Sequence, residues 1–477
     1  LEREPALFEA VPVFADYNHR PLEDSRVTRI VDAARGRLLI DPTLYDVIVV
    51  AGMDPWLPQS AALTTVEGLR LLKARLRPGG LLAQRVQLSS TTGPALETIL
   101  RTFARTFESI LLFQTSPEDL LVLGSSEPLA LDVGWFKNVF GSSPSVAQDV
   151  ARVLPLNING VLLEFRLGGD ALRGLLDGGP LNDDGHAPVE VASYRQLRVH
   201  DNSVLLTRID NAWTGLGPFL RNAGGTKKEK AEFLYNVAKS YLGAAADPGR
   251  ARGIAQELAG IGRAAMARWV TGECLIQEKD IDGALGEWQA VLDLEPHNLD
   301  ALFSLGTFYL DSNDYRRAET YLSHAARLYP DTPVVRYTRG RNLYLLGRYK
   351  EAIPELQKAR DLPGGKDQYP VIDYILGASE LQVGQVKDAS AALEAYLKWA
   401  TTQPVLTRLD VDAHLKLAQA YERLGKRFLA HQEREKGDKL LKKIQASGQG
   451  SAVAAPSTVA PSAPTTAGPR TPRHGQP

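Results

Sequence analysis

The chain has 477 residues, 44% of them hydrophobic and 23% charged, and its formal net charge is −1. This balanced charge argues against a general nucleic-acid-binding protein, which carries a basic excess. The one cysteine, Cys274, excludes a disulfide within the chain and a zinc site built from several cysteines. No apolar run approaches the roughly 18–20 residues of a membrane-spanning helix. We therefore expect a cytoplasmic protein, whose membrane association would depend on segments upstream of Leu1.

The first 130 residues alternate between strand-like and helix-like patterns. Apolar runs predict five strands, at 27–32, 45–52, 80–88, 109–115 and 119–125. Helical periodicity predicts helices between them, at 64–76 and 94–107. This alternation predicts an α/β domain over 1–130, with a parallel, doubly wound sheet and antiparallel pairing at its end.

Residues 131–222 mix short helical patterns with strand-like pieces at 160–167 and 203–209. We interpret them as a small α/β extension of the first domain, with the loop LNDDGHAP at 181–188. The segment NAGGTKKEK, at 222–230, combines glycines with charged residues and predicts a linker.

From residue 231 onward the pattern is helical only, and a helical lead-in at 231–263 precedes an internal repeat. Three residue types recur at a spacing of 34: Gly272, Gly306 and Gly340; Ala284, Ala318 and Ala352; Pro296 and Pro330. Glycine at a close helix crossing, alanine on the second helix and proline after it are typical of tetratricopeptide repeats (TPR). The pattern continues, after a three-residue insertion, with Gly377 and Ala389, and then with Ala418, Tyr421 and Ala430. The sequence thus predicts an all-α TPR solenoid of about five repeats over 264–441.

The last segment, 446–477, is rich in proline, alanine, serine and threonine. This composition cannot build an apolar core, so it predicts a disordered tail.

Three stretches of the first part carry a resemblance to a known family. YDVIVV…DPW, LTTVEGLRLLKARLRPGGLLAQ and LNDDGHAPVEV, within residues 1–197, resemble the spermidine/spermine synthase family. They look most like its bacterial branch, which is often fused to membrane segments or helical repeats. The resemblance implies a Rossmann-like fold of the class I methyltransferase type, whose first strand and glycine turn would lie upstream of Leu1. It also implies binding of decarboxylated S-adenosylmethionine and transfer of its aminopropyl group to an amine.

The same resemblance assigns roles to individual residues. Glu2 occupies the place of the acid that holds the ribose hydroxyls, and a solvated acid is the alternative. Asp32 lies one residue before Ala33, where the family has its adenine-contacting acid. Ala51 stands where the family has an acid after the strand, and Asp54 is a weak substitute because an Asp before a proline more often shapes a turn. The resemblance thus implies no certain cofactor and a domain that has lost its catalytic acid.

The loop at 181–188 offers a second constellation of polar residues. Asp183 and Asp184 match an acid pair of the family, and His186 follows them. Without the rest of the site we expect the two acids to form a turn, and we expect no metal ligand there.

The repeats suggest a binding surface instead. The fifth position of the first helix in each repeat is aromatic: Trp269, Phe303, Tyr337 and Tyr374. Such a ladder predicts a groove for an extended peptide or an amphipathic helix, and the alternative is that the rings pack between repeats. The residues four positions on, Glu273, Thr307 and Arg341, do not resemble a clamp for a terminal carboxylate.

Two hypotheses follow for the whole chain. The first is a protein-interaction scaffold that joins a peptide-binding TPR array to an inactive aminopropyltransferase-like domain. The alternative is an active aminopropyltransferase of polyamine biosynthesis, with the repeats serving for assembly. Ala51 favours the first hypothesis.

Overall fold

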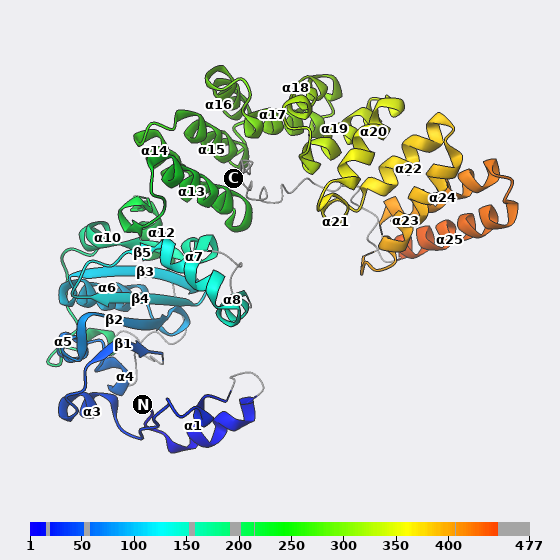
Figure 1. The fold of residues 1–477 in the computed structure, drawn as a ribbon. Helices are drawn as coiled ribbons and strands as arrows, with labels where there is room; N and C mark the ends of the chain where they lie inside the picture. Colours follow the sequence, from blue (N-terminus) through cyan, green and yellow to red (C-terminus); the bar gives the residue numbers. More distant parts are fainter. Residues whose placement is uncertain are drawn as a thin grey trace, which may run out of the picture. The chain divides into compact units, whose positions relative to one another are not determined.

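The computed structural model describes residues 1–15, 20–51, 58–151, 158–190, 202–213, 215–405 and 407–446. The chain divides into two compact units, Leu1–Ile261 and Gly262–Pro477 (Figure 1). The first unit is a mixed α/β structure, and the second unit is built from helices alone within its described residues.

The first unit contains a five-stranded sheet with the strand order β1-β2-β4-β3-β6. Its strands are β1 (Tyr45–Val50), β2 (Leu76–Gln87), β3 (Ser109–Ser116), β4 (Asp119–Ser125) and β6 (Phe165–Gly168). β1 and β2 are parallel, whereas β4 is antiparallel to both β2 and β3, and β6 is antiparallel to β3. It follows that β1, β2 and β3, which are joined through helices, all run in one direction.

Antiparallel pairing is more extensive than the sequence predicted. A parallel sheet with antiparallel pairing at its end was expected, but only one of the four strand pairs in this five-stranded sheet is parallel. The reason is the tight turn at Pro117 and Glu118, which folds β4 back on β3 as a hairpin. β4 then lies between β2 and β3 and separates two strands that run the same way.

Helices pack on this sheet around a continuous apolar core. α5 (Val66–Ala74) and α6 (Gly93–Thr106) begin at the N-caps Thr65 and Thr92, whose side chains accept hydrogen bonds from backbone N–H groups. The fully buried core side chains come from both helices and from the strands: Leu69, Leu82, Leu96, Ile99, Phe103, Ile110, Leu112 and Leu120. Burial of this apolar surface is the main stabilising term for the unit.

Two predicted strands are not strands. At 27–32 the structure has only an isolated parallel bridge between Glu2 and Val31. Residues 203–209 belong to helix α12 (Ser203–Asn211), where Leu205 and Ile209 are buried at a spacing of four while Val204 is exposed. The piece at 160–167 divides between helix α9 (Ile158–Leu163) and strand β6.

The remaining described elements of the first unit are short. They are α1 (Pro5–Ala10), η1 (Val11–Phe14), η2 (Pro21–Glu23), α3 (Ala34–Ile40), α4 (Pro58–Ala61), η3 (Leu88–Ser90), β5 (Leu131–Asp132), α7 (Val133–Ser142), α8 (Pro144–Ala151), α10 (Gly169–Leu175), η4 (Gly217–Phe219) and β7 (Leu220–Arg221). β5 and β7 pair in parallel as a separate two-stranded sheet.

The first unit ends with helices that the sequence interpretation assigned to a linker and a lead-in to the repeats. α13 (Lys227–Ser240) begins inside the predicted linker, at a capping box made by Thr226 and Glu229. The chain continues through η5 (Tyr241–Ala245) to α14 (Pro248–Gly260). The fully buried Tyr241 donates its hydroxyl to the carbonyl of Leu162 at 2.7 Å, which ties this segment to the first unit.

The described residues of the second unit form five consecutive helix pairs. They are α15 (Ala264–Gln277) with α16 (Ile281–Leu294), α17 (Leu299–Asp311) with α18 (Tyr315–Leu328), α19 (Pro333–Leu345) with α20 (Tyr349–Asp361), α22 (Ile372–Val383) with α23 (Val386–Ala400), and α24 (Arg408–Arg423) with α25 (Arg427–Ala446). The predicted insertion forms the short helix α21 (Gly365–Gln368). The predicted disordered tail lies outside the described residues from 447 onward.

The recurring glycines mark where the two helices of a pair touch. A Cβ at Gly272 would lie 2.5 Å from Trp288, and at Gly306 it would lie 2.6 Å from Leu322. Gly340 faces Leu356 in the same way, and Gly377 faces Leu393, always sixteen residues further on. The recurring alanines of the second helices, Ala284, Ala318, Ala352 and Ala389, are fully buried. The 34-residue period therefore reflects one packing geometry repeated along the unit.

Candidate functional site

The structure brings Glu2 and Asp32 together through their backbones. The amide of Asp32 donates to the carbonyl of Glu2 at 3.1 Å, and the amide of Glu2 donates to the carbonyl of Ile30 at 3.0 Å. Their carboxylates, however, serve local turns. Oε1 of Glu2 accepts from the amides of Arg3 and Glu4, and Oδ1 of Asp32 accepts from that of Ala33.

Among the described residues, the position that follows β1 has no side chain that could act in catalysis. Ala51 directly follows the strand and is exposed, and Asp54 lies outside the described residues. A decarboxylated S-adenosylmethionine site needs acids toward the nucleoside and a base for the amine. The described residues do not fit that group, because Ala51 places a methyl side chain at the strand end, and Glu2 and Asp32, the acids that the resemblance assigns to the nucleoside, serve local turns.

The loop at 181–188 is held by its own acids. Asp183 Oδ1 accepts from the amides of Gly185 and His186, at 2.9 and 2.7 Å, so its predicted turn-forming role is confirmed. Asp184 forms an ion pair with Arg35, whose hydrogen bond lowers the pKa of this carboxyl. The His186 side chain is 90% exposed.

Sequence reasoning missed Asn182 in this loop. This fully buried side chain donates from Nδ2 to Thr64 at 2.9 Å, and its amide donates to Thr102 at 3.0 Å. Its carbonyl also accepts from the amide of Val66. Asn182 thereby joins the loop to α5 and α6, which is an anchoring role rather than a catalytic one.

Two other kinds of site are absent from the part of the chain that the structure describes. No group of three or more His, Cys, Asp or Glu side chains there is arranged to hold a metal ion. Among the same residues, no helix combines the length and the apolar character that crossing a membrane requires.

The aromatic ladder is packed between repeats rather than displayed. Trp269, Tyr337 and Tyr374 are 9%, 5% and 8% exposed, and only Phe303 is half-buried. The groove exposure predicted for Trp269, Tyr337 and Tyr374 is therefore wrong. Each ring is covered because the following repeat reaches over it, as the alternative interpretation proposed.

Specific contacts to the next repeat hold the three rings. Trp269 donates from Nε1 to Ser304 on α17 at 3.1 Å, and Tyr374 donates from its hydroxyl to Asp412 on α24 at 2.5 Å. The ring of Tyr337 stacks on Tyr369, with centroids 4.7 Å apart. These rings belong to the packing between repeats instead of offering a free surface.

A polar side chain lies four residues after each of the first three aromatic positions of the ladder. Glu273, Thr307 and Arg341 are all half-buried. Glu273 accepts a hydrogen bond from the Ser304 hydroxyl at 2.6 Å. Arg341 has a buried Nη1 without a hydrogen-bond partner among the described residues, and Asp311 Oδ1 lies 3.8 Å from it. Burial raises the pKa of Asp311, although the guanidinium of Arg341 opposes this shift.

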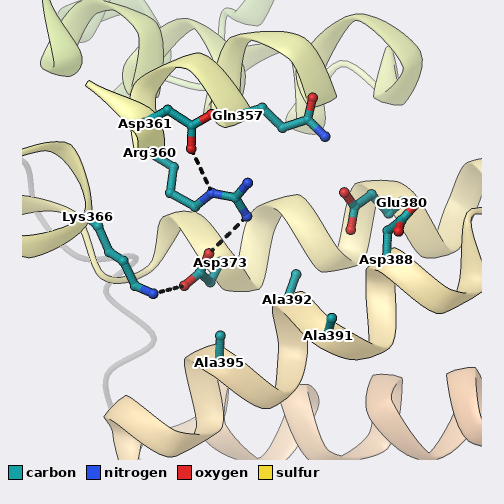
Figure 2. Close-up of a pocket in the computed structure, with 10 residues that line it drawn as sticks. All are labelled: Gln357, Arg360, Asp361, Lys366, Asp373, Glu380, Asp388, Ala391, Ala392 and Ala395. Carbon is teal, nitrogen blue, oxygen red and sulfur yellow. Dashed lines mark hydrogen bonds and ion pairs between the residues drawn. The ribbon is translucent and has the colours of Figure 1, made fainter. Parts of the chain in front are cut away.

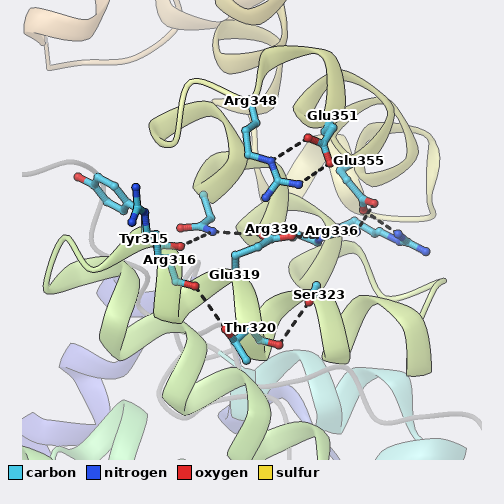
Figure 3. Close-up of polar contacts among 11 residues, drawn as sticks. Tyr315, Arg316, Glu319, Thr320, Ser323, Arg336, Arg339, Arg348, Glu351 and Glu355 are labelled. Atoms are coloured by element: carbon cyan, nitrogen blue, oxygen red, sulfur yellow. Dashed lines mark hydrogen bonds and ion pairs between the residues drawn. The ribbon is translucent and has the colours of Figure 1, made fainter.

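A network of ion pairs connects the second and third repeats (Figure 3). Arg339 on α19 contacts Glu319 on α18 at 3.0 Å and Glu355 on α20 at 2.7 Å. Arg336 adds a second contact to Glu355 at 2.6 Å. These four side chains are 13–19% exposed, so water screens them less than a surface pair.

The match to a protein-family model agrees with the repeat geometry. The family model described as tetratricopeptide repeat matches residues 275–341. Part of the chain is similar to a solved structure of MamA, with 24% identity and a TM-score of 0.32, over 37% of this chain and 96% of that one. It is also similar to YrrB, titled "a TPR protein with an unusual peptide-binding site", with 18% identity and a TM-score of 0.35, over 41% of this chain and 95% of that one. A third, MamA from Desulfovibrio magneticus RS-1, has 18% identity and a TM-score of 0.33, over 38% of this chain and 97% of that one. No curated protein matches. The family match and the repeated helix pairs identify the second unit as a TPR array.

Proposed function

We propose that the chain is a protein-interaction scaffold whose TPR array binds an extended polypeptide along its first helices. The observation that carries the proposal is Nη1 of Arg341, a buried donor without a hydrogen-bond partner in the described part of the array. A buried N–H without a partner costs free energy. A carbonyl or carboxylate oxygen of a bound peptide would remove that cost.

The equivalent side chains of the two preceding repeats support peptide binding along the same face of the array. Glu273 and Thr307 occupy the equivalent positions of the two preceding repeats, so acid, hydroxyl and guanidinium follow one another at the repeat spacing. The packed rings one turn earlier provide a rigid floor, which lowers the entropy lost on binding. Affinity would then come from hydrogen bonds to the peptide backbone rather than from exposed aromatic rings.

The test uses the full-length protein and a peptide array. Peptides that bind the immobilised protein are titrated by calorimetry against the wild type, Arg341→Met and the control Arg316→Met, an exposed arginine on α18. We expect Arg341→Met to weaken binding by about tenfold, as the loss of one charge-assisted hydrogen bond would. Absence of any binding peptide, or equal affinity of both variants and the wild type, would refute the proposal.

For the first unit we infer an aminopropyltransferase-like domain of the spermidine synthase type that has lost its catalysis. Ala51 at the end of β1 and the local use of the Glu2 and Asp32 carboxylates support the loss. Calorimetric titration with the thioether nucleoside product is the decisive measurement. A dissociation constant near or below about 1 μM, which corresponds to about −8 kcal/mol, would instead favour the active enzyme.

A further inference from the structure

A cavity of about 490 Å³ lies in the TPR array between α20, α22 and α23 (Figure 2). Cavities of roughly 300–1,000 Å³ are typical of small-ligand sites. Its residues come mainly from the second helices of the third and fourth repeats, so it does not include the row Glu273, Thr307 and Arg341. The cavity is therefore separate from the proposed peptide surface.

The charge of the cavity is negative. Four carboxylates line it, against the two cations Arg360 and Lys366. Both cations are already engaged, because Arg360 pairs with Asp361 at 3.4 Å and with Asp373 at 3.6 Å, and Lys366 pairs with Asp373 at 3.6 Å. Asp361 and Asp373 are thus compensated by cations, and the remaining two carboxylates set the character of the site.

Those two carboxylates are Glu380 and Asp388, which Figure 2 shows beside each other at one end of the cavity. Glu380 is only 3% exposed, and its Oε2 is buried without a hydrogen-bond partner in the described structure. Within the same residues neither carboxylate forms an ion pair with Arg360 or Lys366. A buried carboxylate next to a second acid is costly unless a cation or a proton accompanies it.

One wall of the cavity is apolar and small, and it continues from Asp388 along the same helix. Ala391, Ala392 and Ala395 on α23 present methyl groups to the cavity, and Ala391 is exposed at its edge. A short alkyl chain could pack along these methyl groups while its charged end reaches the acids. Lysine side chains commonly combine an apolar stem with a charged head in this way.

We propose that this cavity binds an alkylammonium group, with the ammonium held by Glu380 and Asp388 and the alkyl stem lying on the three alanines. The group would be supplied by a lysine side chain of a partner or by a free amine. An ammonium offers three donors, which suits two adjacent carboxylates that include a free oxygen. No group is transferred, and the site is one of recognition alone.

The experiment titrates the full-length protein with two probes, n-butylammonium and the peptide acetyl-Gly-Lys-Gly-amide, by NMR or calorimetry. We expect saturable binding that increasing salt weakens. The same peptide with an acetylated lysine lacks the charge and should not bind. Tighter binding of the peptide supports a protein partner, whereas equal binding of both probes supports a free amine, and either result supports the shared chemistry.

Three variants locate the site. Glu380→Gln keeps the side-chain shape and should weaken binding by about tenfold. Ala391→Leu fills the cavity from an exposed position and should also weaken it, without any change in charge. Asp367→Asn removes an exposed acid of α21 that does not line the cavity, and it should bind as the wild type does. Absence of saturable binding, or equal binding by Glu380→Gln and the wild type, would overturn the proposal.

Discussion

The guanidinium of Arg339 donates two hydrogen bonds to the same carboxylate oxygen of Glu319, at 3.0 and 3.1 Å. Because Glu319 lies on α18 and Arg339 on α19, the contact joins the second repeat to the third (Figure 3). TPR arrays are stabilised by the packing within each repeat and by the interface between neighbours. This pair therefore contributes to the interface part of that stability.

Replacing Arg339 by methionine should destabilise the array. The change leaves the half-buried carboxylates of Glu319 and Glu355 without this partner, and hydrogen bonds to charged groups contribute about 1.5–3 kcal/mol. Denaturant unfolding of the full-length protein measures the loss. The control Arg348→Met removes only an exposed pair with Glu351, for which about 0–1 kcal/mol is expected. Equal losses in both variants would show that the network adds nothing beyond a surface pair.

Gly306→Ala should destabilise the second repeat through a direct clash. Its new Cβ would lie 2.6 Å from Cδ2 of Leu322, and overpacking of this kind costs about 1–3 kcal/mol. Gly286 on α16 is the matched control, since nothing lies within 4 Å of a Cβ at that position. Gly286→Ala should stabilise by about 0.5–1 kcal/mol, because alanine favours a helix interior. Thermal unfolding distinguishes the two signs, and a stabilised Gly306→Ala would contradict the packing described for the repeats.

The repeats were predictable because their signal is local and recurs. Gly272, Gly306 and Gly340 each face the residue sixteen positions later. Because every repeat uses the same helix-pair geometry, the same residue spacing recurs along the sequence. The sheet was predictable only in part. Apolar runs in the sequence located β1, β2, β3 and β4. The insertion of β4 between β2 and β3, however, depends on contacts between segments that are distant in the sequence.

The candidate site was predicted less well, since burial depends on what covers a helix. Periodicity placed Tyr337 and Tyr374 on one face of their helices, but it did not reveal that the next repeat covers that face. Asp373 and Glu380 were missed for the same reason. Every residue of α22 from Ile372 to Leu381 is buried, and two acids within that otherwise mostly apolar run were the available signal.

Stability of the array should depend on the ionisation of Glu380. Burial, together with the nearby charges of Asp388 and Asp373, raises the pKa of this carboxyl to about 7, although Arg360 and Gln357 oppose the shift. The pKa in the folded state thus exceeds the ordinary value of 4.5. Between these two pH values the folded state holds more protons, so the free energy of unfolding falls as pH rises.

Glu380→Gln should remove this pH dependence. Relative to the wild type, the variant should be more stable at pH 8, and this advantage should disappear below pH 4.5, where the wild-type carboxyl is protonated in both the folded and the unfolded state. Calorimetric melting temperatures across this range provide the measurement, with Asp367→Asn as the control for loss of an exposed acid. A difference between Glu380→Gln and the wild type that does not change with pH would contradict the prediction.

Tyr337→Ala should destabilise the array because the ring is core rather than a ligand contact. The side chain is 5% exposed and stacks on Tyr369 at an interplanar angle of 18°. Truncating a buried aromatic side chain to alanine costs about 3–5 kcal/mol. Phe428 on α25 is the matched control, since it is 73% exposed and its replacement should change stability by less than about 0.5 kcal/mol. Urea unfolding of both variants separates the two roles of an aromatic ring. If Tyr337→Ala unfolded at the wild-type midpoint, the ring would be free to contact a peptide, and the packing between the third and fourth repeats would rest on other residues.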